Sequence, residues 1–170
     1  RNGHGRVVFI NGDPGMGKTE LAEQFLALAA RQGHLLLARG RCLEQFGTGE
    51  AYLPFLEACR ALLVGPDRER IAPLVRRHAP SWFAAFGGLS GLADSVEALR
   101  HELRDASSAR MLREMGDALE ALAQLEPVVL LLEDMHWADP SSSDLLRLLG
   151  QRAIARRLLI LATLRGSEIE

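Results

Sequence analysis

A glycine-rich segment near the start of the chain limits its fold more than any other feature. Eight consecutive residues fit the pattern GxxxxGK[ST]: Gly12, Asp13, Pro14, Gly15, Met16, Gly17, Lys18 and Thr19. The run of β-branched and aromatic residues before it, Arg6–Asn11, predicts a buried strand of a parallel sheet. The segment after it, Lys18–Gln32, predicts a helix that ends before Gly33. A glycine loop between a strand and a helix can surround a phosphate group with backbone N–H groups.

Each residue type in this loop has a physical reason. The three glycines lack a Cβ, so the backbone can take positive φ and approach a ligand closely. The dipole of the following helix points its positive end at the same place. Lys18, the single lysine among the 20 basic residues, adds a full charge near the β- and γ-phosphates, and the Thr19 hydroxyl can ligate Mg²⁺. We therefore predict that Gly12–Thr19, together with Glu20, binds ATP.

The rest of the chain predicts further strands and helices around this unit. Large and small apolar residues at helical spacing give the first helix its core-facing side, and these are Leu21, Phe25, Leu28 and Ala29. Three of the segments that follow are predicted strands: His34–Arg41, Val128–Leu132 and Leu158–Leu164. The other four are predicted helices: Leu53–Val64, Arg68–Arg77, Asp94–Leu125 and Ser141–Arg152. The longest is expected to divide near Ser107 and Ser108, after a flexible break at Gly87–Gly91. Alternation of strands with helices favours an α/β fold with a parallel sheet.

Charged residues end two of the predicted strands. Val128–Leu132 is wholly aliphatic, which predicts a strand covered on both faces, and Glu133 and Asp134 follow it at once. Parallel strands all end on the ligand side of a sheet. We expect Glu133 to hold the metal through water and Asp134 to polarise the attacking water. Arg165 ends the last strand and is a candidate contact for the γ-phosphate. The simpler alternative for all three is a solvated charge at a strand end.

The turn after the acidic pair leaves two alternatives open. His136 either senses the γ-phosphate or bonds backbone within the turn. Trp137 is expected to be a packing anchor rather than a platform for a base. Asp139 is a natural N-cap for the next helix, with Pro140 at its first position.

Composition excludes several classes of function. A formal charge of −2 over 170 residues gives no electrostatic reason to expect nucleic acid or an anionic membrane. Cys42 and Cys59 lack metal-ligand spacing and are expected to be small buried hydrophobes in a cytoplasmic protein. No apolar run is long enough for a membrane span. Because Lys18 is the only lysine, the chain lacks the N-K-x-D motif that binds guanine, which disfavours a GTPase.

These elements together resemble the STAND/AAA-like ATPase domains of bacterial LuxR/MalT-type regulators and of ATPase–TPR proteins, some of them joined to adenylate cyclase domains. The resemblance rests on NGDPGMGKTEL, RGRCLEQFGTGEAYLPFLEA, RRHAPSWF, ARMLREMGDALEAL, LLLEDMHWADPSSSDLL and ILATLRG. It implies a three-layer α/β P-loop NTPase sandwich with a parallel sheet in the order 5-1-4-3-2, whose fifth strand would follow Glu170. It also implies a helical insert at about 43–126, a Walker B pair at Glu133 and Asp134, and a sensor-1 residue at Arg165.

The function this resemblance implies is an ATP-driven regulatory switch that hydrolyses ATP slowly with Mg²⁺. Residues 1–170 are then one domain of a longer protein, with winged-helix, TPR and output domains as partners and possible self-assembly. Tyr52, Leu53 and Pro54 of the insert either face a partner or pack against the sheet. The alternative functions are a small-molecule kinase and a nucleotide-binding module without hydrolysis.

Overall fold

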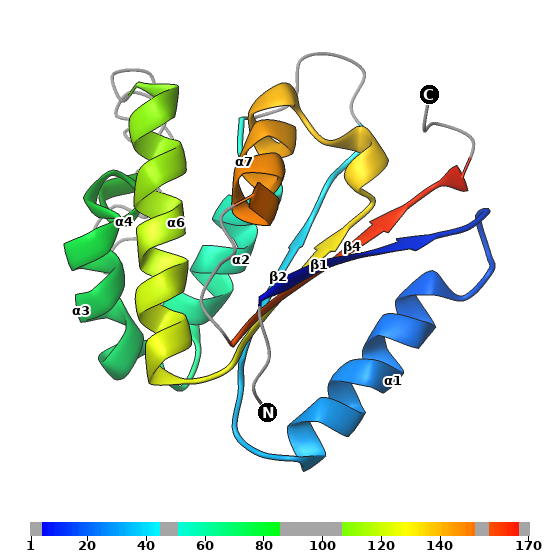
Figure 1. Cartoon of the computed structure of the whole chain (residues 1–170), viewed down its shortest axis with the longest axis horizontal. Helices are drawn as coiled ribbons and strands as arrows, with labels where there is room; N and C mark the ends of the chain where they lie inside the picture. The colour runs from blue at the N-terminus through cyan, green and yellow to red at the C-terminus, as the bar shows by residue number, and fades with distance from the viewer. Residues whose placement is uncertain (1–4, 45–50, 86–106, 152–156, 167–170) are drawn as a thin grey trace.

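A computed structural model describes residues 5–44, 51–85, 107–151 and 157–166 as a parallel sheet with helices on both faces (Figure 1). In chain order its elements are β1 (Arg6–Asn11), α1 (Lys18–Arg31), β2 (Leu36–Arg41), α2 (Leu53–Val64), α3 (Arg68–His78), α4 (Pro80–Ala85), α6 (Ser108–Leu125), β3 (Val128–Glu133), the 3₁₀ helix η1 (Met135–Trp137), α7 (Pro140–Gln151) and β4 (Leu158–Leu164). The predicted α/β fold with a parallel sheet is confirmed.

The sheet brings the ends of distant segments to one edge. Its described strands lie in the order β1-β4-β3-β2, and each neighbouring pair is parallel. The register pairs Asn11 with Leu164 and Arg41 with Glu133, so these strands finish level with one another. The loops after β1, β3 and β4 consequently leave the sheet on the same side (Figure 1).

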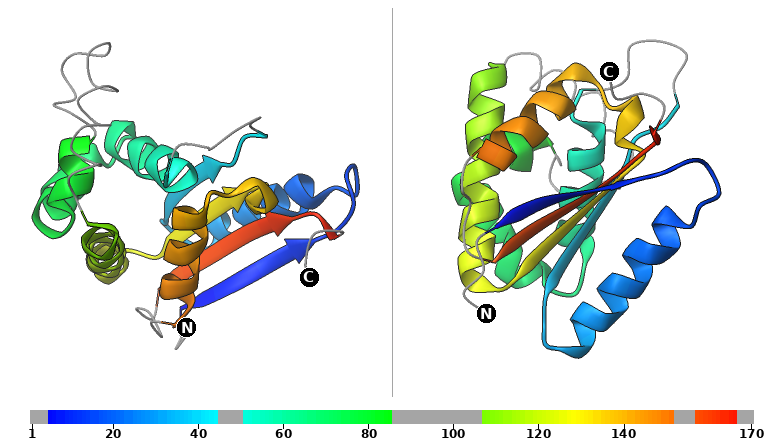
Figure 2. Two further views of the ribbon diagram at one scale, coloured as in Figure 1. Left: turned by 90° about the horizontal axis from the view of Figure 1, so that it is seen from above. Right: turned by 45° about the vertical axis from the view of Figure 1, so that its right-hand side comes forward.

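The two faces of the sheet are covered unequally. Of the described helices, α1 alone lies on one face, whereas α2, α6 and α7 lie on the other (Figures 1 and 2). β3 contributes to both sides, as the prediction of a strand covered on both faces requires. Leu131 packs with α1, and Leu130 and Leu132 belong to the larger core. The smaller core consists of Ala22, Leu26, Val129, Leu131 and Leu161.

Most predicted elements are confirmed, with shifts of one or two residues at their ends. α6 begins at Ser108 because the Ser107 hydroxyl accepts a hydrogen bond from the Arg110 N–H at 3.3 Å, which confirms the expected serine cap. The segment before Ser107 and the break at Gly87–Gly91 lie outside the described residues. α4 and η1 are absent from the sequence prediction because both are too short for a periodic pattern. Among the helices within the described ranges, none has the length and apolar character needed to cross a membrane.

Asp139 joins the start of α7 to the start of α2. Its Oδ1 accepts a hydrogen bond from the Ser142 N–H at 3.0 Å, which confirms the predicted N-cap. Its Oδ2 accepts one from the Tyr52 N–H at 3.2 Å. Tyr52 and Pro54 are buried, and the Tyr52 ring meets Trp82 edge-on at 5.3 Å. The sequence predicts that the segment Tyr52, Leu53 and Pro54 either faces a partner or packs against the sheet, and this burial favours packing within the fold.

Two expectations about burial are wrong. The sequence predicts a buried β1, yet Phe9 is 55% exposed, because β1 is an edge strand of the described sheet with only β4 beside it. The sequence also places Leu21, Phe25 and Leu28 on the buried side of α1, yet Leu21 and Leu28 are 60% and 57% exposed. The helix buries Ala22 and Leu26 instead, since a small residue permits close approach to the sheet.

Gly40 in β2 has no room for a side chain. A Cβ at this position would lie 1.7 Å from the carbonyl oxygen and 2.9 Å from the Cα of Pro54, which are backbone atoms at the start of α2. Gly40→Ala is expected to push α2 from the sheet and to lower the free energy of unfolding by about 3 kcal/mol or more. Urea-induced unfolding followed by circular dichroism measures this loss.

A matched control is Gly150→Ala in α7. A Cβ at this position would meet only Val7 Cγ2, at 3.6 Å, which is ordinary van der Waals contact. Alanine in a helix is favoured over glycine by about 0.5–1 kcal/mol, so this variant is expected to be as stable as the wild type or more so. Equal stability of the two alanine variants would contradict the close packing of β2 on α2.

Both thiols are predicted to resist alkylation in the folded protein. The sulfurs of Cys42 and Cys59 lie 3.6 and 3.9 Å from the sulfurs of Met135 and Met115, and burial raises the pKa of each thiol to about 12. Iodoacetamide at pH 8 should therefore modify both in denaturant and neither in the native state. Their contribution to stability is complete below the ordinary thiol pKa of about 8.5 and is lost as pH rises toward 12. Native-state modification, read by mass spectrometry, would contradict this.

Candidate functional site

The loop between β1 and α1 is curled by two glycines. Gly15 and Gly17 have φ of 82° and 79°, in the left-handed region that favours glycine. The Met16 N–H donates to the carbonyl of Asp13 at 3.3 Å, which closes a turn. Gly17, the capping residue of α1, offers no side-chain acceptor to the N–H groups of the first helical turn. Loop and helix end thus provide backbone donors that suit an anion.

Lys18 lies back over the beginning of this loop. Its Nζ donates to the carbonyl of Gly12 at 2.7 Å and to that of Asp13 at 3.1 Å. Within the part of the chain that the structure describes, Lys18 makes no ion pair. The ammonium group is therefore held at the loop, with no carboxylate of the described ranges paired to it.

Thr19 and Glu133 come together although they are 114 positions apart in the chain. The Thr19 hydroxyl, in the first turn of α1, donates to Glu133 Oε1 at 3.1 Å. Glu133 is the last residue of β3, the strand that lies two places from β1 in the sheet. The pair places a hydroxyl oxygen and a carboxylate oxygen side by side at the end of the glycine loop.

Asp134 is held in an uncommon backbone conformation by its neighbours. Its φ of 56° is in the left-handed region, which is rare for a residue other than glycine. The Asp134 N–H donates to the hydroxyl of Thr163 in β4 at 2.9 Å. Its Oδ2 accepts a hydrogen bond from Arg41 Nε at 3.1 Å and forms an ion pair with Arg41 Nη2, also at 3.1 Å. Thr163 in β4 thus holds the backbone of Asp134, and Arg41 in β2 holds its carboxylate.

Sequence reasoning missed Arg41 and Thr163. Arg41 is the last residue of β2, so the rule that singled out Arg165 as a charge at the end of a parallel strand applies to it equally. Thr163 carries no such signal, because it lies inside an apolar strand and is 2% exposed. Its role as an acceptor is visible only in the folded chain.

Arg165 lies directly after β4 and over an aromatic ring. Its guanidinium carbon is 4.4 Å from the centroid of the Trp137 ring. A Cβ at the next residue, Gly166, would lie 3.4 Å from Asn11 Oδ1 and 3.8 Å from Asp13 Oδ1. The chain beside Arg165 therefore runs against the beginning of the glycine loop.

Three residues of the predicted ATP site form no hydrogen bond or ion pair with the acidic strand end within the described ranges, namely Pro14, Met16 and Glu20. Pro14 and Met16 are exposed, the latter by 71%. Glu20 points along α1, where its Oε1 accepts a hydrogen bond from Gln24 Nε2 at 2.8 Å. The structure thus gathers the loop backbone, Thr19 and the acidic pair, and leaves these side chains outside.

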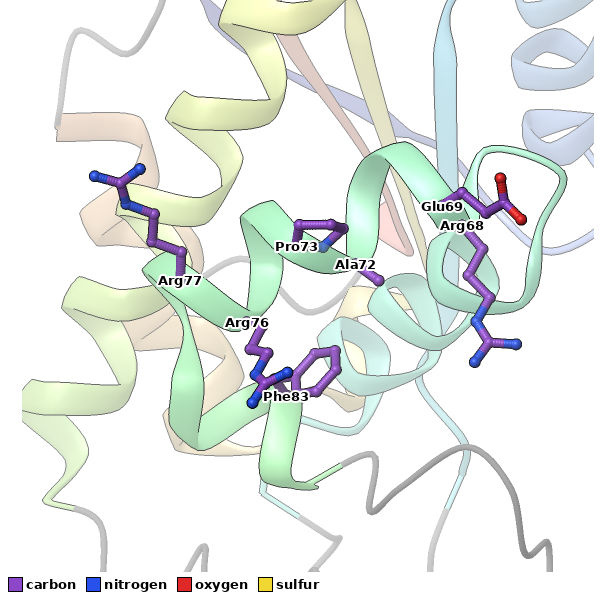
Figure 3. Close-up of a pocket in the computed structure, with 7 residues that line it drawn as sticks. All are labelled: Arg68, Glu69, Ala72, Pro73, Arg76, Arg77 and Phe83. Carbon is purple, nitrogen blue, oxygen red and sulfur yellow. The ribbon is translucent and has the colours of Figure 1, made fainter.

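A groove of about 880 Å³ lies elsewhere, along α3 and α4 (Figure 3). It is lined by Arg68, Glu69, Ala72, Pro73, Arg76, Arg77 and Phe83. Arg76 lies next to Phe83, whereas Arg68 and Arg77 point away from it in different directions (Figure 3). These guanidinium groups do not converge on one point, so the groove lacks the arrangement that an anion site requires.

Comparison with known proteins places the glycine loop and the acidic pair within one family match. A family model described as "AAA ATPase domain" matches residues 1–161, a range that includes Thr19, Glu133 and Asp134 and ends before Arg165. An uncharacterized protein of Rhizobium meliloti (strain 1021) is 31% identical over 172 residues. That alignment covers 95% of this chain and 16% of the length of the Rhizobium protein.

Proposed function

This chain belongs to the AAA ATPase domain family, and from that premise we propose that it binds ATP with Mg²⁺ at Gly12–Thr19 and hydrolyses it slowly. The observation that carries the proposal is the 3.1 Å contact between Thr19 Oγ1 and Glu133 Oε1. It joins the phosphate loop to the acidic strand end, and a nucleotide–metal complex needs both.

The donor set at this edge fits magnesium. Mg²⁺ takes six oxygen ligands and usually keeps several waters beside one or two carboxylates and the phosphates of a substrate. Thr19 and Glu133 supply one hydroxyl and one carboxylate. In the described ranges no group of three or more His, Cys, Asp or Glu side chains could hold a metal. Waters and the phosphates of the nucleotide would therefore have to supply the remaining ligands. When bound, the ion would neutralise charge on the phosphate oxygens.

The other residues would act on the phosphates and on water. The loop N–H groups would hold the phosphate oxygens, and Lys18 would move its ammonium group from the loop carbonyls toward the β- and γ-phosphates. Arg41 contacts Oδ2 of Asp134, which leaves Oδ1 to accept a hydrogen bond from the attacking water and orient it. Arg165 would contact the γ-phosphate.

The resemblance to STAND-type domains extends the proposal to regulation. Binding of ATP would favour one conformation of a longer cytoplasmic protein, and slow hydrolysis would reset it. The share of the Rhizobium protein that the chain spans, 16%, supports a setting with further domains. Winged-helix, TPR and output domains, self-assembly, a fifth strand beside β1 and a helical insert at about 43–126 all belong to this proposal.

One observation favours a second candidate, a module that binds nucleotide without hydrolysing it. Asp134, the proposed partner of the attacking water, already forms an ion pair with Arg41. If this pair persists with nucleotide bound, the carboxylate could be too restrained to act on water.

The test uses the full-length natural protein and measures two quantities. Isothermal titration calorimetry compares ATP with GTP, each with and without Mg²⁺, and phosphate release is followed alongside mass analysis of candidate acceptors. We expect Mg²⁺-dependent binding, ATP bound more tightly than GTP, and release of free phosphate. Binding without release would favour the non-hydrolysing module, and a phosphorylated acceptor would favour a kinase. Absence of nucleotide binding would overturn the proposal.

A further inference from the structure

Trp137 supports the guanidinium group of Arg165. The distance of 4.4 Å from the Arg165 guanidinium carbon to the ring centroid is well inside the roughly 6 Å range of cation–π attraction. The two residues come from different segments, η1 after β3 and the loop after β4, which are adjacent strands. The stacking therefore depends on the fold and not on neighbourhood in the sequence.

The indole ring is itself fixed. The backbone that carries it is held in a turn, because the main-chain N–H of Trp137 donates to the carbonyl of Asp134 at 2.9 Å and the main-chain N–H of Ala138 donates to that of Met135 at 3.1 Å. Trp137 is half-buried against the larger core, and its other neighbour is the His136 ring at a centroid distance of 4.5 Å. A ring held from several sides can orient a flexible arginine side chain.

The stacking leaves the N–H donors of Arg165 uncommitted. Among the described residues, Arg165 forms neither an ion pair nor a hydrogen bond, so no carboxylate in that part of the chain compensates its charge. Stacking engages the face of the guanidinium plane, whereas the N–H donors lie in that plane and at its edge. Because a Cβ at Gly166 would lie within 4 Å of the Asn11 and Asp13 side chains, the backbone next to Arg165 passes close to the glycine loop.

We propose that Trp137 is a positioning residue, which presents the Arg165 guanidinium to the terminal phosphate of a bound nucleoside triphosphate. The inference rests on the proposed function, because it requires nucleotide at the glycine loop. It adds the means of discrimination: a diphosphate lacks the group that Arg165 would meet, so the Trp137–Arg165 pair favours the triphosphate. In this role the tryptophan is more than the packing anchor that the sequence predicts.

The experiment measures ATP and ADP affinity in the full-length protein with Mg²⁺, for Trp137→Leu, Trp137→Phe, Arg165→Met and the Leu/Met double variant. Trp137→Leu keeps an apolar side chain but removes the π face, and is expected to weaken ATP binding about three- to thirtyfold with ADP affinity within about twofold. Trp137→Phe, which retains a face, should recover most of the loss. The double variant should bind ATP no more weakly than Arg165→Met alone, since both changes remove one interaction.

A spectroscopic measurement without nucleotide checks the stacking directly. Removal of the charge over the ring in Arg165→Met is expected to shift the tryptophan emission relative to the wild type. Arg147→Met, at an exposed arginine on α7, is the control and should leave the spectrum unchanged.

The outcomes separate this inference from the function on which it rests. If the wild type binds nucleotide but Trp137→Leu weakens ATP and ADP equally, or adds its loss to that of Arg165→Met, the positioning role is overturned and the proposed function stands. An unchanged emission spectrum in Arg165→Met also overturns it. If the wild type binds neither ATP nor ADP, both the function and the inference are overturned.

Discussion

Lys18→Ala is expected to weaken ATP binding by roughly a hundredfold or more, as measured by isothermal titration calorimetry with Mg²⁺. The lost ammonium group makes charge-assisted hydrogen bonds to phosphate oxygens in the proposed complex, and about 3 kcal/mol for such contacts corresponds to this change in affinity. No other lysine in the chain can replace it. The folded protein should tolerate the change, because the hydrogen bonds of Lys18 Nζ to described residues go to the carbonyls of Gly12 and Asp13, in the exposed loop itself.

The matched control for Lys18→Ala is Arg31→Ala. Arg31 is an exposed basic residue in the last turn of the same helix, so its loss removes the same charge far from the loop. ATP affinity of this variant should stay within about twofold of the wild type, because salt screens the attraction between ATP and an exposed charge at the far end of the helix. Equal affinities of the two variants would show that the loop is not the site.

Asp134→Asn is expected to reduce phosphate release by at least about a hundredfold while ATP affinity stays within a few-fold of the wild type. Loss of a general base usually costs a factor of 10² to 10⁴ in rate. Asparagine suits the site structurally, because it tolerates the left-handed backbone better than most residues and can still accept from Arg41. The N–H bond to Thr163 involves only the backbone of residue 134 and would remain.

Asp144→Asn provides the comparison for this substitution. Asp144 is exposed on α7 and pairs with Arg147 at 3.2 Å, so the same isosteric change is made in a carboxylate outside the site. Its phosphate release should match that of the wild type. Unchanged release in Asp134→Asn would remove Asp134 from the mechanism, and loss of binding together with release would indicate a role in holding the nucleotide.

The parallel sheet and the grouping of the site could be predicted from the sequence because both follow from local pattern and one topological rule. Aliphatic runs such as Val128–Leu132 define strands, and parallel strands end at one edge, which brings Glu133 toward the glycine loop. The contact of Thr19 with Glu133 is consistent with that expectation. What each residue does there stays a prediction.

Features that depend on distances between elements could not be predicted in this way. The spacing of Leu21, Phe25 and Leu28 identifies an apolar side of α1, but only the closeness of helix and sheet decides that Ala22 faces inward. The ion pair of Arg41 with Asp134 depends likewise on which strands become neighbours and on the left-handed turn at Asp134. A sequence pattern contains neither the distance between α1 and the sheet nor the order of the strands.

The unequal covering of the sheet gives the domain one part packed on the larger core and a second part packed on the smaller core. The glycine loop belongs to the second, because α1 is fixed through a small core while β1 remains largely exposed. Free energies of local opening increase with buried apolar contact, so α1 and the loop can fluctuate while β2, β3 and α6 stay folded. A ligand that bridges Thr19 and Glu133 would fasten α1 to the centre of the sheet. Part of the binding free energy would then raise the free energy of local opening of this helix. The free energy of unfolding of the whole domain would change less.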